Sequence, residues 1–138
     1  MLRVIDPIAT QLPEILRSIP ENTPIVMLNL LRFRDRAAYR EGTFEGSGRE
    51  AYSRYLEVAN RKVEEVGGKV LFMSTAVAAI ISPPDEIWHE VLLMQYPSIE
   101  AFATMLAMKD YQAATVHRTV ALEDARLFAT IEHAPFRT

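Results

Sequence analysis

The chain has 138 residues, of which 49% are hydrophobic and 24% charged, and its formal net charge is −3. These values predict one globular domain with a sizeable core, and they exclude a disordered chain and the basic surface of a nucleic-acid-binding protein. The absence of cysteine excludes disulfides, thiolate metal sites and a cysteine nucleophile. No apolar run approaches the roughly 20 residues of a membrane span, and the first residues lack the apolar segment of a secretion signal. We therefore expect a soluble, cytoplasmic protein without a membrane or nucleic-acid partner.

The domain is expected to cover residues 1–138, with a helical extension over residues 1–23. Thr10 is the expected N-cap of a short helix in that extension. The apolar run 25–33 predicts the first strand of the main pattern, and a polar loop over residues 34–46 follows it.

The next three elements have clear local signals. Ser47 and Glu50 form a capping box that begins a helix, and the pair Gly67-Gly68 ends it. The run 70–81 is expected to be the second strand. A proline-rich turn then returns the chain as a third strand over residues 88–96, which predicts a hairpin.

The last elements complete a known order. Pro97-Ser98 begins a second helix, a shorter helix runs over residues 110–118, and the final strand is expected over residues 126–132. Strand, helix, strand, strand, helix, strand is the split βαβ order of a ferredoxin-like α+β domain. We therefore predict a four-stranded antiparallel sheet with both main helices on one face.

The predicted strands also indicate a homodimer. The runs 25–31, 70–81 and 91–94 are apolar on both faces, although only one face of such a sheet is covered by helices. The simplest cover for the second face is the same face of another copy, related by two-fold symmetry. The alternative is that the short N-terminal helix folds over that face.

Five segments carry a resemblance to a known family, and they are MLNLLRF (27–33), REAYSRYLE (49–57), VGGKVLF (66–72), EVLLMQYPSIEAF (90–102) and DYQAATVHRTVALEDARL (110–127). They resemble the bacterial family called domain of unknown function 1330, of the dimeric α+β-barrel superfamily. The most specific pieces are Tyr111-Gln112, His117-Arg118-Thr119 and Tyr96-Pro97-Ser98. The resemblance implies the fold and the dimer but no settled reaction, since related barrels include cofactor-free monooxygenases, lactone isomerases and haem enzymes.

Polar side chains from three segments are expected at the end of the sheet where the first strand finishes, because the third and last strands both begin there. A catalytic role is predicted for His117, which would move a proton, and for Asn29, which would orient a carbonyl or hydroxyl group. Arginine side chains nearby would hold a negatively charged group of the substrate. The predicted substrate-binding residues are Arg32, Arg118, Glu90 and Trp88.

Each of these residues also has a purely structural interpretation. Arg32 would form a salt bridge to Glu90 or Asp124, and Arg118 would contact Glu123. The histidine would cap a helix end, and the asparagine would be a buried amide with satisfied hydrogen bonds.

Three function hypotheses remain open. The leading one is a small-molecule enzyme or ligand-binding protein that acts, without a metal or another cofactor, on a small compound that carries a carboxylate. The second is a non-catalytic dimeric binding module. The third is a haem-binding barrel in which His89 or His117 would coordinate the iron. The sequence contains no glycine-rich phosphate loop, nucleophile elbow or HExxH motif that would select a reaction class.

Overall fold

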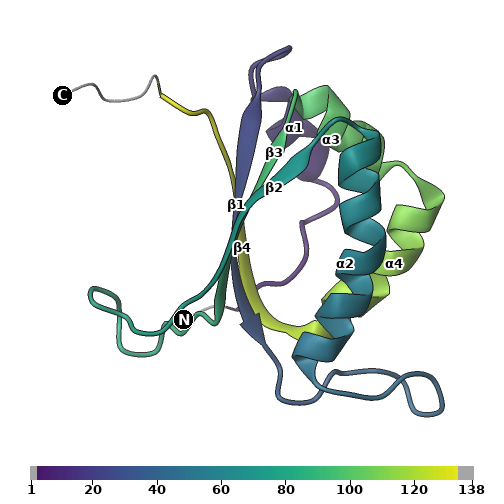
Figure 1. The fold of residues 1–138 in the computed structure, drawn as a ribbon, viewed down its shortest axis with the longest axis vertical. Coiled ribbons are helices and arrows are strands. Elements are labelled where there is room, and N and C mark those ends of the chain that lie inside the picture. Colours follow the sequence, from purple (N-terminus) through teal and green to yellow (C-terminus); the bar gives the residue numbers. More distant parts are fainter. Residues whose placement is uncertain (1–2, 134–138) are drawn as a thin grey trace.

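A computed structural model describes residues 3–133 and shows a four-stranded antiparallel sheet with helices packed on one face (Figure 1). The strands lie in the order β2-β3-β1-β4, so β1 and β3 are central. This order confirms the predicted ferredoxin-like α+β fold. The elements are α1 Leu12–Arg17, β1 Ile25–Phe33, α2 Gly48–Glu65, β2 Lys69–Thr75, β3 Glu90–Tyr96, α3 Ile99–Leu106, α4 Lys109–Ala121 and β4 Leu122–Thr130.

The hydrophobic core lies between the sheet and the helices. Burial alternates along β1, so Ile25, Met27, Leu31 and Phe33 face the helices while the residues between them face away. Helices α2 and α3 close this layer with amphipathic faces. Among residues 3–133 no helix is both long enough and apolar enough to cross a lipid bilayer.

Local chemistry sets the ends of the main helices. The Ser47 hydroxyl accepts a hydrogen bond from the Glu50 amide, and the Glu50 carboxylate accepts one from the Ser47 amide, so the predicted capping box is confirmed. Gly67 follows α2 with a φ of 85°, a left-handed conformation that glycine adopts without strain. Ser98 caps α3 by accepting a hydrogen bond from the amide of Ala101.

Residues 76–89 form an arm that leaves the sheet, although residues 76–81 and 88–89 are predicted to be strand. β2 ends at Thr75 rather than at residue 81, and β3 begins at Glu90 rather than at residue 88. The apolar residues of the arm have no neighbouring strand to pair with. Their hydrophobicity alone therefore does not make a strand.

Two further boundaries differ from the prediction. Helix α1 begins at Leu12 and is preceded by Gln11, whose side chain makes no capping hydrogen bond, so Thr10 is not the N-cap. Helix α4 continues to Ala121 and β4 begins at the next residue, earlier than the predicted residue 126. The reason is that pairing with β1 starts directly at the end of the helix, through a shift in strand register.

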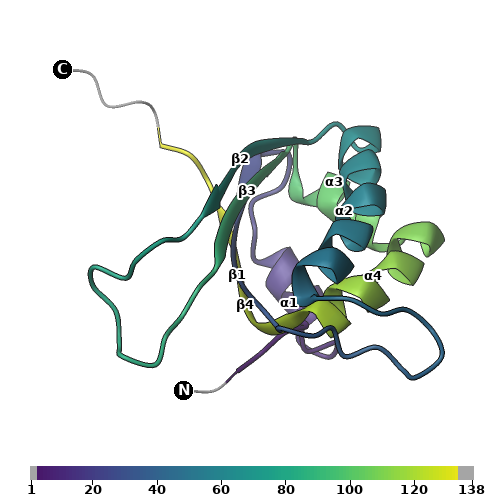
Figure 2. The ribbon, with the colours of Figure 1, turned by 60° about the horizontal axis from the view of Figure 1, so that its bottom comes forward.

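The sheet face turned away from the helices has no helix on it within residues 3–133. Helix α1 lies on the helix side together with α2, α3 and α4 (Figures 1 and 2), and its Leu16 packs against the core. The alternative that the N-terminal helix covers the far face is therefore wrong. We call this far side the open face, and its apolar residues are Val26, Leu28, Leu30, Phe72, Val91, Leu93 and Phe128.

Candidate functional site

The six predicted site residues do not meet in one pocket. Asn29 is buried on the helix-facing side of β1, where its side-chain amide donates to a backbone carbonyl of β3 at 3.2 Å. Arg32 lies on the open face, and its Nε is 3.2 Å from a carboxylate oxygen of Glu123, not of Glu90 or Asp124 as the structural interpretation proposed. Because the sheet separates the two side chains, they cannot hold the same small ligand.

Glu90 and the neighbouring His89 lie at the base of the arm. A carboxylate oxygen of Glu90 is 3.6 Å from the guanidinium of Arg49. The Nδ1 atom of His89 accepts a hydrogen bond from the amide of Phe33 at 2.9 Å, and the two rings stack. One of the two imidazoles that the haem hypothesis named thus fastens the arm to the end of β1. Within residues 3–133 no three metal-ligating side chains gather at one point.

Of the remaining three predicted residues, Arg118 and Trp88 contact structural partners. Arg118 donates to the carbonyl of Ile5 at 2.7 Å and lies 3.3 Å from Asp6, instead of the predicted glutamate of β4. It therefore ties the N-terminal segment to α4. Trp88 packs beneath the guanidinium of Arg126, which lies 5.1 Å from the centre of a Trp88 ring.

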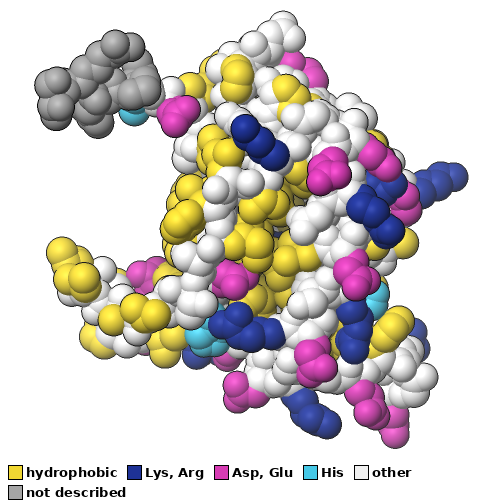
Figure 3. All heavy atoms as spheres, viewed as in Figure 1, with side chains coloured by type: hydrophobic (Ala, Val, Ile, Leu, Met, Phe, Trp, Pro, Cys, Tyr) yellow, Lys and Arg dark blue, Asp and Glu magenta, His cyan; other side chains and the backbone are white. Residues whose placement is uncertain are grey.

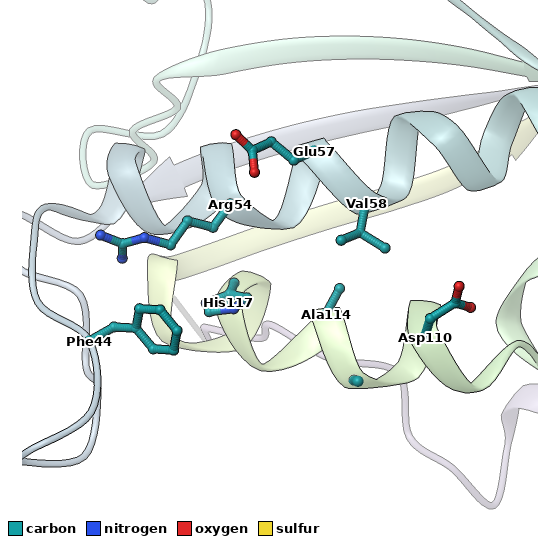
Figure 4. A pocket seen from close by; sticks show the side chains of 8 residues that line it. Phe44, Arg54, Glu57, Val58, Asp110, Ala114 and His117 are labelled. Carbon is teal, nitrogen blue, oxygen red and sulfur yellow. The ribbon is translucent and has the colours of Figure 1, made fainter.

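His117 is placed differently from the other predicted residues, in a groove between α2 and α4 (Figure 4). The loop that joins β1 to α2 covers one end of this groove, and Val58 and Ala114 face each other across its middle. Its volume is about 400 Å³. The residues that line it are Phe44, Arg54, Glu57, Val58, Asp110, Ala113, Ala114 and His117.

Three polar side chains form a hydrogen-bonded chain at the covered end of the groove. An Nη atom of Arg54 donates to the hydroxyl of Tyr39 at 3.0 Å, and this hydroxyl is 2.6 Å from Nδ1 of His117. Because the hydroxyl already accepts from Arg54, we assign its own proton to the bond with Nδ1, which leaves the imidazole proton on Nε2. Burial, together with the charge of Arg54, lowers the pKa of His117, in agreement with a neutral imidazole.

Two aromatic rings hold the guanidinium of Arg54 in place. Its central carbon is 5.5 Å from the ring centre of Tyr39 and 5.2 Å from that of Phe44. The ring of Phe44 also meets His117 edge-on at 4.9 Å. A second Nη atom of Arg54 donates to the carbonyl of Glu45 at 2.8 Å. These contacts fasten the loop onto the helices and fix the direction of the positive charge.

The charges in the groove are not balanced along its length. In the part of the chain that the structure describes, no carboxylate lies within ion-pair distance of Arg54. At the other end Asp110 pairs with Lys62 at 2.5 Å, and this hydrogen bond lowers the pKa of Asp110 and raises that of Lys62. The covered end therefore presents a positive charge with no described carboxylate at ion-pair distance, beside a neutral N–H donor.

Three residues of this site, Tyr39, Phe44 and Arg54, are not among those predicted from the sequence. The available signal for the two aromatic residues was their presence in an otherwise polar loop. Arg54 stands four residues after Glu50 and three before Glu57, which is a pattern typical of a solvated helix face.

Solved structures of other proteins have the same fold as this chain. The crystal structure of a protein of unknown function from Rhodopseudomonas palustris is 36% identical, with a TM-score of 0.88 over 97% of this chain and 100% of that chain. A dabb family protein with a ferredoxin-like fold from Mesorhizobium loti is 13% identical, with a TM-score of 0.50 over 80% of this chain and 98% of that one. The hydroxynitrile lyase from Passiflora edulis is 7% identical, with a TM-score of 0.56 over 84% and 99%. At such identities the last two share the fold alone.

The family comparison covers most of the chain. No curated protein is similar enough to match it. The family described as Domain of unknown function (DUF1330) matches residues 37–130, which include α2 and all of the sheet except β1. The chain therefore belongs to the DUF1330 family and has a ferredoxin-like α+β fold.

Proposed function

We propose that the protein binds a small carboxylate with an apolar or aromatic body in the groove between α2 and α4. The observation that carries this proposal is the half-buried guanidinium of Arg54, which two rings hold in place and which pairs with no described carboxylate. Such a group is stabilised by a carboxylate ligand, because the two carboxylate oxygens match its planar arrangement of donors. The apolar part of the ligand would contact Val58 and Ala114.

His117 supports a binding role in preference to base catalysis. With Tyr39 donating to Nδ1, the donor left for a ligand is the N–H group at Nε2. A general base needs a lone pair on that nitrogen, and this tautomer has none there. We therefore assign His117 to ligand binding, in place of the proton transfer expected from the sequence.

The dimensions and remaining charges narrow the ligand class. A volume of about 400 Å³ falls in the range of small-molecule sites. Glu57 lines the same groove, and its carboxylate would repel a second negative charge on the ligand. A monocarboxylate is therefore favoured over a dicarboxylate.

Isothermal titration calorimetry with benzoate and its neutral isostere benzamide tests the proposal. We expect benzoate to bind with a dissociation constant of about 1 mM, a value typical of a fragment with so few atoms, and benzamide to bind more weakly. Arg54→Gln should weaken benzoate binding at least about tenfold, which corresponds to one charge-assisted contact. Arg61→Gln, an exposed arginine of the same helix, is the matched control and should bind like the wild type. Equal benzoate affinity in both variants would contradict the proposal.

We further propose that the protein is a homodimer in which a second copy covers the open face. The apolar side chains of that face would otherwise stay half in water, and helix α1 is on the other side of the sheet. Two identical faces related by a two-fold axis are self-complementary.

Light scattering after size exclusion tests the assembly. We expect the mass of two subunits at micromolar concentration. The variant Leu28→Lys places a charge in the middle of the open face and should elute as a monomer. A wild-type mass of one subunit would refute the dimer.

A further inference from the structure

The arm carries the most exposed large aliphatic side chains in the described chain. Val77, Ile80 and Ile81 are 91%, 94% and 95% exposed, whereas the next large hydrophobic side chain, Ile8, is 60% exposed. Aliphatic surface of this extent is unfavourable in water, so a cluster of such residues on one segment indicates a partner. Figure 3 shows hydrophobic side chains on the arm, at the lower left and away from the body of the molecule.

Backbone hydrogen bonds form at the base and at the tip of the arm but not between them. At the base the amide of Ala76 donates to the carbonyl of His89 at 2.9 Å. At the tip the amide of Glu86 donates to the carbonyl of Pro83 at 3.1 Å, which closes a turn. No hydrogen bond of the described chain involves residues 77–81. The aliphatic stretch therefore has no hydrogen-bonding partner in the described part of its own subunit.

The position of the arm points to a second copy of the chain. The arm projects from the end of β2 and β3, away from the helices, in both ribbon views (Figures 1 and 2). The open face begins at the same two strands, where Phe72 and Leu93 pair across it. The arm therefore leaves the sheet from two strands of the open face, and a copy seated on that face lies within reach of it.

The chemistry of the arm disfavours a lipid surface as its partner. Residues 76–89 contain no lysine or arginine, and the tip carries Asp85 and Glu86. Segments that bind anionic membranes use basic residues beside the apolar ones. A protein partner, whose binding does not require basic residues in the arm, is therefore favoured over an anionic membrane.

We propose that the arm is a dimerisation arm, which seats Val77, Ile80 and Ile81 on a second copy of this chain. The inference rests on the homodimer proposed above. Two-fold symmetry makes the contact reciprocal, so each subunit both donates an arm and receives one. The arm adds buried apolar area at the edge of the sheet interface and fixes the relative orientation of the two subunits.

Sedimentation equilibrium of the triple variant Val77→Ser, Ile80→Ser, Ile81→Ser tests the arm. We expect its dimer dissociation constant to rise at least about 100-fold, which is about 2.8 kcal/mol at 1.4 kcal/mol per tenfold. The control Ile8→Ser, Val116→Ser removes two exposed aliphatic side chains elsewhere and should leave the constant unchanged. A triple variant that dimerises like the wild type would overturn the arm while leaving the sheet interface standing, and a monomeric wild type would overturn both.

Crosslinking identifies the surface on which the arm rests. Since the chain has no cysteine, Ile81→Cys provides a unique thiol for a benzophenone maleimide. Irradiation should give a covalent dimer, with the crosslinked peptide in the other subunit. Crosslinks confined to the same subunit would overturn the proposal. So would sedimentation of the wild type with phosphatidylcholine vesicles that the triple variant loses, since that result would assign the arm to a membrane.

Discussion

Replacing Tyr39 by phenylalanine removes the hydroxyl that joins Arg54 to His117 and keeps the ring that contacts both side chains. Two hydrogen bonds are lost, one of them to a charged donor. Both are only partly buried, so water can replace part of each. A loss of about 1–2 kcal/mol in the free energy of unfolding follows. For a chain of this length that corresponds to a fall in Tm of about 3–8 °C.

Urea unfolding followed by circular dichroism measures this loss, at one fixed protein concentration because a dimer's stability depends on it. Tyr96→Phe is the matched control. The hydroxyl of Tyr96 is buried, but its contacts are to the sulfur atoms of Met94 and Met105 at 3.8 and 3.9 Å, which are weak acceptors. If Tyr39→Phe lost no more than Tyr96→Phe, the hydrogen-bonded chain would not be what holds the loop on the helices.

Three further predictions concern the backbone, the pH dependence and a helix cap. Gly48→Ala should prevent folding or lower the free energy of unfolding by more than about 3 kcal/mol, because the added Cβ would lie 2.3 Å from the carbonyl oxygen of Arg34. At Gly42 an added Cβ meets no atom within 4 Å, so Gly42→Ala should lower it by only about 1 kcal/mol, because of the positive φ. Thermal unfolding of the two variants measures the difference. The pKa of His117 is lowered in the folded state, so its contribution to stability is complete above the unfolded pKa of about 6.5 and is lost as pH falls from that value through the lower pKa of the folded state. Stability of the wild type should therefore decrease from pH 7 to pH 5 more than that of His117→Gln, and parallel curves would contradict this. Ser47→Ala should lower the free energy of unfolding by about 1 kcal/mol through loss of the α2 cap, measured by urea unfolding, and no change would contradict the capping role.

The fold was predictable where local chemistry and hydrophobic period agree. The first strand has the predicted bounds because its apolar run ends where the polar loop starts, and α2 begins at the capping box of Ser47 and Glu50. The arm was not predictable in the same way. Its valine and isoleucine residues continue the apolar run of β2, and only the absence of a pairing strand in the described chain distinguishes them from a strand.

The candidate site was less predictable because topology assigns a residue to one end of a sheet but not to a face or a layer. The period of a strand already places Asn29 and Arg32 on opposite faces, which rules out a shared pocket. His117 was expected near a helix end, but α4 runs on to Ala121, so its imidazole faces α2 and the loop. Its partner Tyr39 is 78 residues away in sequence, a contact that no local pattern reveals.

The central claim is that the guanidinium of Arg54 and the imidazole of His117 bind one carboxylate ligand. The most direct measurement is a nitrogen-15 NMR titration of the side-chain N–H groups with benzoate. Arg54→Gln and His117→Gln assign the two signals. We expect the Arg54 Nε and His117 Nε2 signals to shift together with one binding curve, while those of Arg61 and His89 stay in place. Shifts that leave Arg54 and His117 unchanged at saturating benzoate would contradict the account.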